Sequence, residues 1–259
     1  MSSLYFISFD HHEETKEEEE ESIPTKLHLQ VPDLIHSIYG SCNGLVLLHT
    51  FGHWSDHQTL VVSNPTTREF VQLPDCDFKI EGHRNTWTRV IDYPDKYHSS
   101  HITSKAFVNG SFHSVATKVS DQTKVIVAFS LADENFSEVP SPTLSYDLDT
   151  FCRLCVVDEK LAIFSWLDAK VWLMNEYGVK GSWTTILLHG LNEIPMIRLP
   201  FVFYVNGKLV LICLNEILIY DIEYGRLSKH IRNTDPMASN FFSCVSVESL
   251  VSPRFNRLN

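Results

Sequence analysis

Three evenly spaced histidines are the first residues whose spacing suggests chemistry. His49, His53 and His57 recur every four residues. On a helix they would share one face and could together ligate zinc. However, the segment follows a strand-like apolar run and contains Gly52 and Trp54, so a hairpin loop is the better interpretation. We therefore expect histidines that face solvent or the edge of the core, and no metal site.

Cys152 and Cys155 form a CxxC pair, the spacing used by zinc sites and by redox-active dithiols. No second pair of this kind occurs, and no alternation of strand and helix surrounds this one, so neither chemistry is supported. We expect both to be buried thiols of a strand. Six cysteines in 259 residues are also too few for a dense disulfide framework, which indicates reduced thiols.

The acidic residues show no catalytic arrangement. Asp133 and Glu134 lie where a polar turn is expected, and carboxylates are common in turns. No spacing pairs two carboxylates for acid–base work. The chain also lacks a G-x-S-x-G elbow, a P-loop and a G-x-G-x-x-G fingerprint. The sequence therefore predicts no catalytic residues, no cofactor and no enzymatic activity.

The charge of the chain narrows the class of partner. The formal net charge is −11, and seven Glu against one Lys put −6 of it in an acidic loop expected at residues 13–22. The like charges of such a run repel one another, so a solvated loop is the main interpretation. The second interpretation is an acidic segment that attracts a basic partner. A basic stripe, which phosphate binding requires, is missing from the sequence. We therefore expect no nucleic-acid partner.

Signals for membrane insertion and secretion are also missing from the sequence. No segment approaches the roughly 18 apolar residues of a membrane span. The apolar run Leu4–Phe9 follows no basic residue and ends at Asp10, unlike a signal peptide. We expect no membrane partner and a cytoplasmic or nuclear location.

Short apolar runs broken by turn residues dominate the chain and predict many short antiparallel strands. The clearest runs are rich in Val, Ile, Leu and Phe: Leu45–Thr50, Thr59–Ser63, Lys124–Ser130, Leu154–Ser165, Phe201–Val205, Lys208–Leu214 and Ile217–Ile222. Val125–Ser130 is nearly all apolar, which is typical of a strand buried on both faces.

These runs recur in a fixed order. Asn43-Gly44, Asn109-Gly110 and Asn206-Gly207 each join two apolar runs, and Asp158-Glu159 is a weaker copy. Asn-Gly favours a type I′ hairpin turn, in which both central residues have positive φ. A second hairpin follows each copy, so each repeat is expected to hold four strands.

The period of this repeat predicts the fold. Phe112, Leu161 and Leu209 occupy equivalent places, 49 and 48 residues apart. Four strands at a period near 50 residues are typical of an all-β, kelch-like β-propeller of short four-stranded antiparallel blades. Stacking the blades radially covers the faces that a single sheet would leave exposed.

One interval breaks the period. Asn43 and Asn109 are 66 residues apart, too long for one repeat and too short for two. Thr86–Val90 is typical of the last strand of a blade, but no earlier strands of that blade are evident in Asp75–Asn85. We predict that roughly 30 residues of a blade are missing in the region 75–94. The expected fold is thus one domain over residues 1–259, an incomplete or irregular propeller.

An ordered set of motifs carries a family resemblance. The set spans most of the chain and comprises Gly40–Val46, Ser63–Phe70, Asn85–Trp87, Phe107–Gly110, Phe129–Glu134, Val171–Trp183 and Val247–Pro253. In this order they resemble the plant F-box-associated domain, a kelch-like propeller. Each motif is weak by itself, and the order of all seven is the strong signal.

The resemblance implies a protein-interaction module, the substrate-recognition part of an SCF-type (cullin) E3 ubiquitin ligase, whose partner is an unknown target protein. In such proteins an upstream F-box docks a Skp-type adaptor. No helical segment of that kind precedes Leu4, so the adaptor is an expected partner only if an F-box is present upstream. Two alternatives remain: a truncated, non-functional fragment, and a propeller with a ligand-binding or enzymatic site.

The tryptophans divide into two groups. Trp87, Trp172 and Trp183 lie late in their repeats, and we expect them to be core anchors between blades. Trp54 lies between His53 and Ser55 in an expected exposed loop, and partner contacts are often Trp or Tyr. Trp54 is therefore the candidate partner-binding residue.

Overall fold

The computed structural model describes residues 4–6, 25–27, 34–51, 58–73, 93–99, 105–144, 148–191, 194, 200–213, 216–232 and 249–253. The chain divides into two compact units, called here unit 1 (residues 1–88 and 242–259) and unit 2 (residues 89–241). Regular structure in the described ranges is almost entirely strand. The helical elements there are short turns, α1 (Leu148–Phe151) and η1 (Lys180–Ser182). Among these residues no helix has the length and apolar character needed to cross a membrane.

Unit 1 contains one antiparallel blade and a short strand pair. The blade has the order β3-β4-β5-β6, with bounds Leu34–Cys42, Leu45–Phe51, Gln58–Asn64 and Glu69–Gln72. The pair consists of β1 (Leu4–Phe6) and β2 (Thr25–Leu27). The core of the blade is a small cluster of Val46, Leu48 and Val61, against which Ile38 and Phe70 pack.

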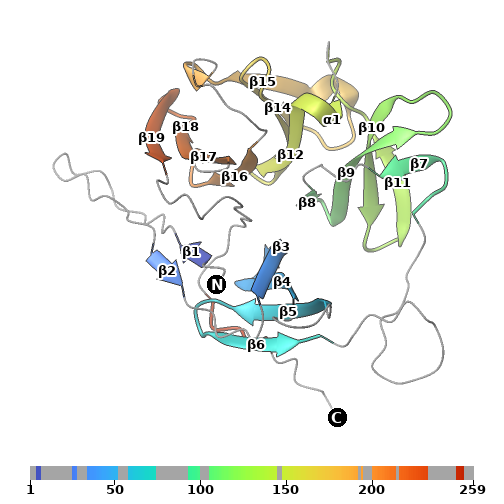
Figure 1. Ribbon diagram of the computed structural model, residues 1–259. Coiled ribbons are helices and arrows are strands. Elements are labelled where there is room, and N and C mark those ends of the chain that lie inside the picture. Colours follow the sequence, from blue (N-terminus) through green and yellow to red (C-terminus); the bar gives the residue numbers. More distant parts are fainter. Residues whose placement is uncertain are drawn as a thin grey trace. The chain divides into compact units, whose positions relative to one another are not determined.

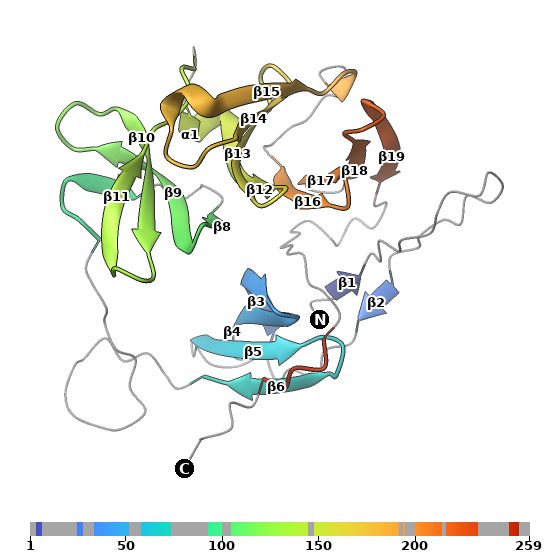
Figure 2. The same cartoon turned by 180° about the vertical axis from the view of Figure 1, so that it is seen from behind.

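Unit 2 contains three antiparallel blades in chain order (Figures 1 and 2). The first consists of β7 (Tyr97–Ser99), β8 (Ala106–Val108), β9 (Ser111–Lys118), β10 (Lys124–Ser130) and β11 (Asn135–Val139). The second consists of β12 (Cys152–Val157), β13 (Lys160–Ser165), β14 (Lys170–Met174) and β15 (Trp183–Leu187). The third consists of β16 (Phe201–Val205), β17 (Lys208–Cys213), β18 (Glu216–Asp221) and β19 (Arg226–Arg232).

The first blade of unit 2 has a divided edge strand. β8 pairs with the beginning of β9 and β7 with its end, so two short strands together occupy the place of one. β10 and β11 complete the sheet on the other side. In β10, Ile126, Val127 and Ala128 are all buried, so both faces of the strand are covered as predicted. The region 75–94, where a blade segment is expected to be missing, lies outside the described residues except for its last two positions.

The Asn-Gly turns have the predicted geometry. Asn43, Asn109 and Asn206 have φ of 51°, 51° and 47°, and the glycine that follows each also has positive φ. Asp158 and Glu159 adopt the same conformation, with φ of 50° and 59°. The predicted weaker copy of the turn is therefore confirmed, and Leu154–Ser165 is wrong as the bounds of a single strand because this turn divides the run into β12 and β13.

Alternate side chains of β12 enter two different hydrophobic clusters. Cys152 and Leu154 belong to the cluster shared with the first blade of unit 2, which includes Ile126. Cys155 and Val157 belong to the cluster shared with the third blade. Because successive strand residues point to opposite faces, the second blade is covered on both sides by its neighbours. This confirms the predicted all-β propeller of short four-stranded antiparallel blades.

Tryptophans anchor this packing. Trp172 and Trp183 are partly buried against the cluster between the first and second blades of unit 2. The indole Nε1 of Trp183 donates to the carbonyl of Pro140, which follows the first blade, at 2.9 Å. The prediction of inter-blade anchors is confirmed for these two residues, and Trp87 lies outside the described residues.

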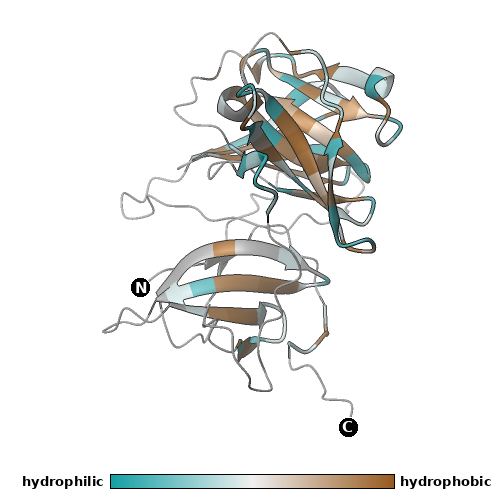
Figure 3. Ribbon diagram, turned by 90° about the vertical axis from the view of Figure 1, so that its right-hand side faces the viewer, coloured by the Kyte–Doolittle hydropathy of each residue, from teal (hydrophilic) through white to brown (hydrophobic). Residues whose placement is uncertain are grey.

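Hydrophobic residues occupy most of the inner strands, and hydrophilic residues are concentrated at the turns and strand ends (Figure 3). In each blade, the turn between the first and second strands and the turn between the third and fourth strands lie at the same end of the sheet, because antiparallel strands alternate in direction. We call this the Asn-Gly end. In the first blade of unit 2 the backbone N–H of Leu131 donates to the carbonyl of Gly110 at 3.1 Å, which joins the first and third turns.

In unit 1 the side chain of Asn64 uses all of its hydrogen-bonding groups. Its Nδ2 donates to the backbone carbonyls of Ser249 and Val251, each at 2.7 Å. Its Oδ1 accepts from the backbone amides of Thr66 and Thr67 at 2.8 and 3.2 Å. The side chain is fully buried. It therefore ties the end of β5 to a segment 185 residues later in the chain.

We expect Asn64→Ala to lower the free energy of unfolding of unit 1 by about 2–4 kcal/mol, because it removes four hydrogen bonds made by a fully buried side chain. Hydrogen exchange at residues 249–253 should accelerate correspondingly. The matched control is Asn175→Ala, whose exposed amide donates to Ser182 and Thr184 and which should cost under about 1 kcal/mol. Equal losses in the two variants, measured by urea unfolding, would show that the Asn64 bonds contribute little.

The Asp158-Glu159 turn offers a second test. A side chain at positive φ costs about 1 kcal/mol relative to glycine, so Glu159→Gly should raise the free energy of unfolding by about 0.5–1 kcal/mol. Gly207 is the reverse case. A Cβ there would meet no atom within 4 Å, so Gly207→Ala introduces only the backbone strain and should lower the melting temperature. Thermal unfolding of both variants checks the opposite signs.

Candidate partner-binding surface

Most of the predicted loop candidates fall outside the described residues. His49 lies in β4 and is half-buried, whereas His53, Trp54 and His57 are not described. Among the described residues, no three His, Cys, Asp or Glu side chains are grouped so that they could hold a metal ion. The assignment of Trp54 as a partner contact and the acidic loop at 13–22 stay predictions.

The CxxC cysteines are buried and separate. Cys152 and Cys155 are both buried cysteines of β12. They lie three residues apart on β12, on opposite faces, and belong to different hydrophobic clusters. Burial raises the pKa of Cys155 to about 12, so its thiol stays protonated at neutral pH. The prediction of buried thiols of a strand is confirmed.

Asp133 and Glu134 of the first blade are turn residues, as predicted. Asp133 and Glu134 are exposed in the turn between β10 and β11, and Glu134 has a φ of 49°. The Oδ2 of Asp133 accepts from the hydroxyl of Ser130 at 2.9 Å, which fixes the turn. This is a structural role and involves no second carboxylate.

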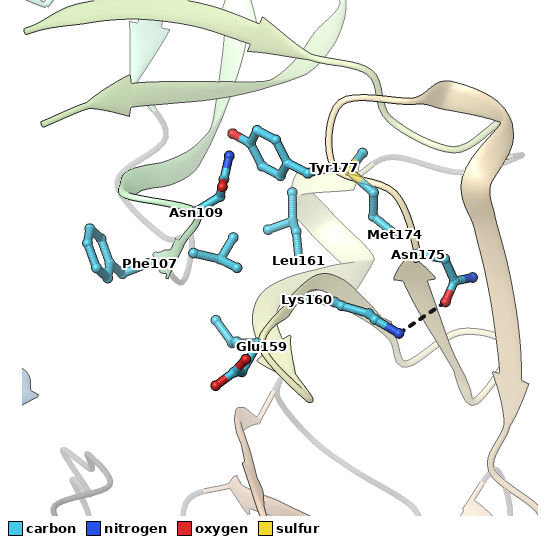
Figure 4. Close-up of a pocket in the computed structure, with 10 residues that line it drawn as sticks. Phe107, Asn109, Glu159, Lys160, Leu161, Met174, Asn175 and Tyr177 are labelled. Atoms are coloured by element: carbon cyan, nitrogen blue, oxygen red, sulfur yellow. Dashed lines mark hydrogen bonds between the residues drawn. The ribbon is translucent and has the colours of Figure 1, made fainter. Parts of the chain in front are cut away.

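A hollow of about 530 Å³ opens at the Asn-Gly end between the first and second blades of unit 2 (Figure 4). We call it the inter-blade hollow. Its lining comes from β8 and the turn after it, from β12, β13 and the turn between them, and from the end of β14: Phe107, Val108, Asn109, Val156, Glu159, Lys160, Leu161, Met174, Asn175 and Tyr177. In Figure 4, Phe107 lies at one end of the hollow and Asn175 at the other, with Leu161 between them.

Two phenylalanines beside the hollow are unusually exposed. Phe107 and Phe112 flank the Asn109-Gly110 turn, lie directly opposite each other on β8 and β9, and have ring centroids 4.8 Å apart. They expose 50% and 48% of their surface. The neighbours Ala106 and Val108 point the other way and are buried. A pair of exposed aromatic rings in contact is more typical of a partner contact than of a free surface.

A hydrogen bond between blades holds Tyr177 at the rim of the hollow. The Tyr177 hydroxyl lies 2.7 Å from Nε2 of His113, a fully buried residue of β9. Nδ1 of His113 lies 3.3 Å from the carbonyl of Ala106, which can only accept. Nδ1 therefore carries the proton in the neutral ring, and Nε2 accepts from Tyr177.

The loop that carries Tyr177 is itself fixed. Between β14 and β15, the Ser182 hydroxyl contacts the carbonyls of Glu176 and Val179, each at 2.8 Å. The Nδ2 of Asn175 donates to Ser182 and Thr184. The rim of the hollow is therefore preorganised rather than loose.

The described side chains of the hollow suit binding. Burial lowers the pKa of His113, and its ring nitrogens contact the carbonyl of Ala106 and the hydroxyl of Tyr177. Glu159 and Lys160 are the charged side chains that line the hollow, with Nζ of Lys160 3.5 Å from Oδ1 of Asn175. Sequence reasoning missed this site, although the placement of Phe107 and Phe112 on either side of Asn-Gly was a signal that could have revealed it.

Comparison with known proteins gives one family match. Residues 76–253, about two thirds of the chain, match the model of the F-box associated beta propeller domain. No curated protein matches the chain.

Two solved structures share its fold only remotely. TolB from Acinetobacter baumannii is 12% identical over 82% of this chain and 46% of that one, with a TM-score of 0.39. Apo AztD from Citrobacter koseri is 12% identical over 83% of this chain and 51% of that one, with a TM-score of 0.31. The chain thus spans about half the length of the solved structures it matches, and at these values they say nothing of its function.

The buried histidine predicts a pH dependence of stability. The pKa of His113 is lower when folded than its ordinary value near 6.5, so the unfolded chain binds a proton first as the pH falls. Stability is therefore lost as the pH drops below about 6.5. Between pH 7.5 and 5.5, the melting temperature of the wild type should fall further than that of His113→Gln.

The control for this test is His98→Gln, which removes an exposed histidine and leaves the bond to Tyr177 intact. Its melting temperature should follow that of the wild type at both pH values. Parallel curves for the wild type and His113→Gln would contradict the prediction.

Proposed function

Because the chain belongs to the F-box associated β-propeller family, we propose that its propeller recognises and holds a target protein for an SCF-type, cullin-based ubiquitin ligase. A recognition subunit of this kind needs a rigid scaffold and an exposed contact surface. It needs no catalytic groups, because other subunits of the ligase carry out the transfer of ubiquitin.

The exposed Phe107–Phe112 pair carries this proposal. The two rings expose about half of their surface beside a hollow with a fixed rim. Burying such side chains against a partner contributes about 25 cal/mol for each Å² removed from water. Aromatic residues at a preorganised site are the usual anchors of protein interfaces.

Two further parts of the proposal concern delivery and location. The family match covers residues 76–253, and the Skp-type adaptor would be bound by an F-box connected to the propeller. We propose that the chain acts in the cytoplasm or nucleus, where cullin ligases work. A propeller without such a connection would hold its target and fail to deliver it.

A comparison of co-purifying proteins tests the proposal. The full chain is tagged, expressed in its source tissue and purified with its partners, as wild type and as the double variant Phe107→Ser/Phe112→Ser. The abundance of target proteins should fall about tenfold or more in the double variant, the effect of losing an interface anchor. The matched control is Leu167→Ser, since Leu167 is 55% exposed in the turn between β13 and β14, at the opposite end of its blade.

Two results would overturn the proposal in distinguishable ways. If the same proteins co-purify with the wild type and the double variant, the aromatic pair is not the recognition surface. A second result concerns proteins that co-purify with the wild type but not with the double variant. If their half-lives in the cell do not lengthen when cullin ligases are inhibited, the propeller binds these proteins outside such a ligase.

A further inference from the structure

We propose that the inter-blade hollow binds an extended segment of a target protein that inserts an apolar side chain and carries Lys or Arg beside it. The inference rests on the proposed function and adds the chemistry of the partner. Three observations support the inference. The walls of the hollow are apolar and already ordered, the rim is open, and the surrounding turns carry a net charge.

The walls of the hollow are apolar and need no rearrangement. Leu161 and Met174 at its base are 1% and 2% exposed and belong to the cluster that joins the two blades. Tyr177 lines the hollow on the same blade, held by its 2.7 Å bond to buried His113, and Phe107 and Val108 of β8 face it from the first blade. A side chain entering between the two blades gains apolar burial without first ordering the site, which is the condition under which contact area converts into affinity.

The openness of the rim favours a polypeptide over a small molecule. Phe107 and Tyr177 line the hollow and still expose 50% and 38% of their surface. Small-molecule sites enclose most of their ligand, which this rim does not do. A volume of about 530 Å³ lies within the range of ligand sites, so it accommodates more than one side chain of an extended segment.

The charge of the surrounding turns favours a partner segment of the opposite, positive charge. Five carboxylates and two lysines lie in the turns at the Asn-Gly end of the two blades or directly beside them, which leaves a net charge of −3: Asp133, Glu134, Asp158, Glu159 and Glu176 against Lys160 and Lys180. Glu159 lines the hollow itself. Among the described residues, no ion pair involves Glu159 or Glu176.

This charge pattern admits basic segments and repels acidic ones. A Lys or Arg next to the inserted side chain meets carboxylates at the rim, whereas a carboxylate there meets like charge. A second copy of this chain is disfavoured for the same reason, because each copy carries a net charge of −11. The occupant that fits is therefore an apolar residue flanked by basic ones.

Peptide selection on the full chain tests the inference. A phage-displayed library of random 12-residue peptides is selected against the wild type, against Glu159→Lys/Glu176→Lys and against the control Leu167→Ser. The wild type and the control should enrich the same peptides, with an apolar residue beside Lys or Arg. The charge-reversed variant should lose this preference, and its affinity for the best wild-type peptide, measured by fluorescence polarisation, should be at least about tenfold weaker.

Circular dichroism and thermal unfolding establish that each variant is folded before selection. Three outcomes overturn the inference: no enriched peptide, enriched peptides without basic residues, and equal affinity in the wild type and the charge-reversed variant. Serine in place of the apolar residue of the best peptide should abolish binding, and retained binding would also overturn it.

Failure of this inference is distinct from failure of the proposed function. If cellular partners depend on Phe107 and Phe112 but charge reversal at Glu159 and Glu176 leaves them bound, the proposed function stands and the basic-segment chemistry is wrong. If no partner depends on the aromatic pair, the recognition function itself is wrong.

Discussion

The packing of β12 between two neighbouring sheets is the constraint on which the candidate site depends. Cys152 and Leu154 are buried against the first blade of unit 2, and Cys155 and Val157 against the third. A strand with no face left for water fixes the blades on either side of it, because any shift would expose apolar surface or open voids. The inter-blade hollow is a consequence. It lies where the covered faces of two blades end and their turns begin.

The polar interactions of unit 2 add precision to this packing. His113 is buried among apolar neighbours, yet both ring nitrogens have partners, one on its own blade and one on the next. Breaking either contact would leave a buried nitrogen unsatisfied, at a cost of about 1–3 kcal/mol. The same pair sets the orientation of Tyr177, so the residue that helps to join two blades also shapes the surface that a partner meets.

The sequence predicted the strands and turns well because their signals are local. Asn-Gly specifies positive φ at two successive residues, and the structure has it at Asn43, Asn109 and Asn206. At Asp158-Glu159 the predicted weaker copy of the turn also forms, but without a glycine its signal was faint, and the bounds Leu154–Ser165 were drawn across it. The site was less predictable, since His113 and Tyr177 are 64 residues apart and alternation alone does not say which face of β8 a neighbouring blade will cover.

The contacts of Asn64 have a consequence for synthesis on the ribosome. Its blade is translated early, but the carbonyls of Ser249 and Val251 that its amide binds are added 185 and 187 residues later. At elongation rates of 5–20 residues per second, this delay is roughly 10–40 s. During that time the side-chain amide of Asn64 must be hydrated instead, so the blade that is translated first acquires its last hydrogen bonds at the end of synthesis.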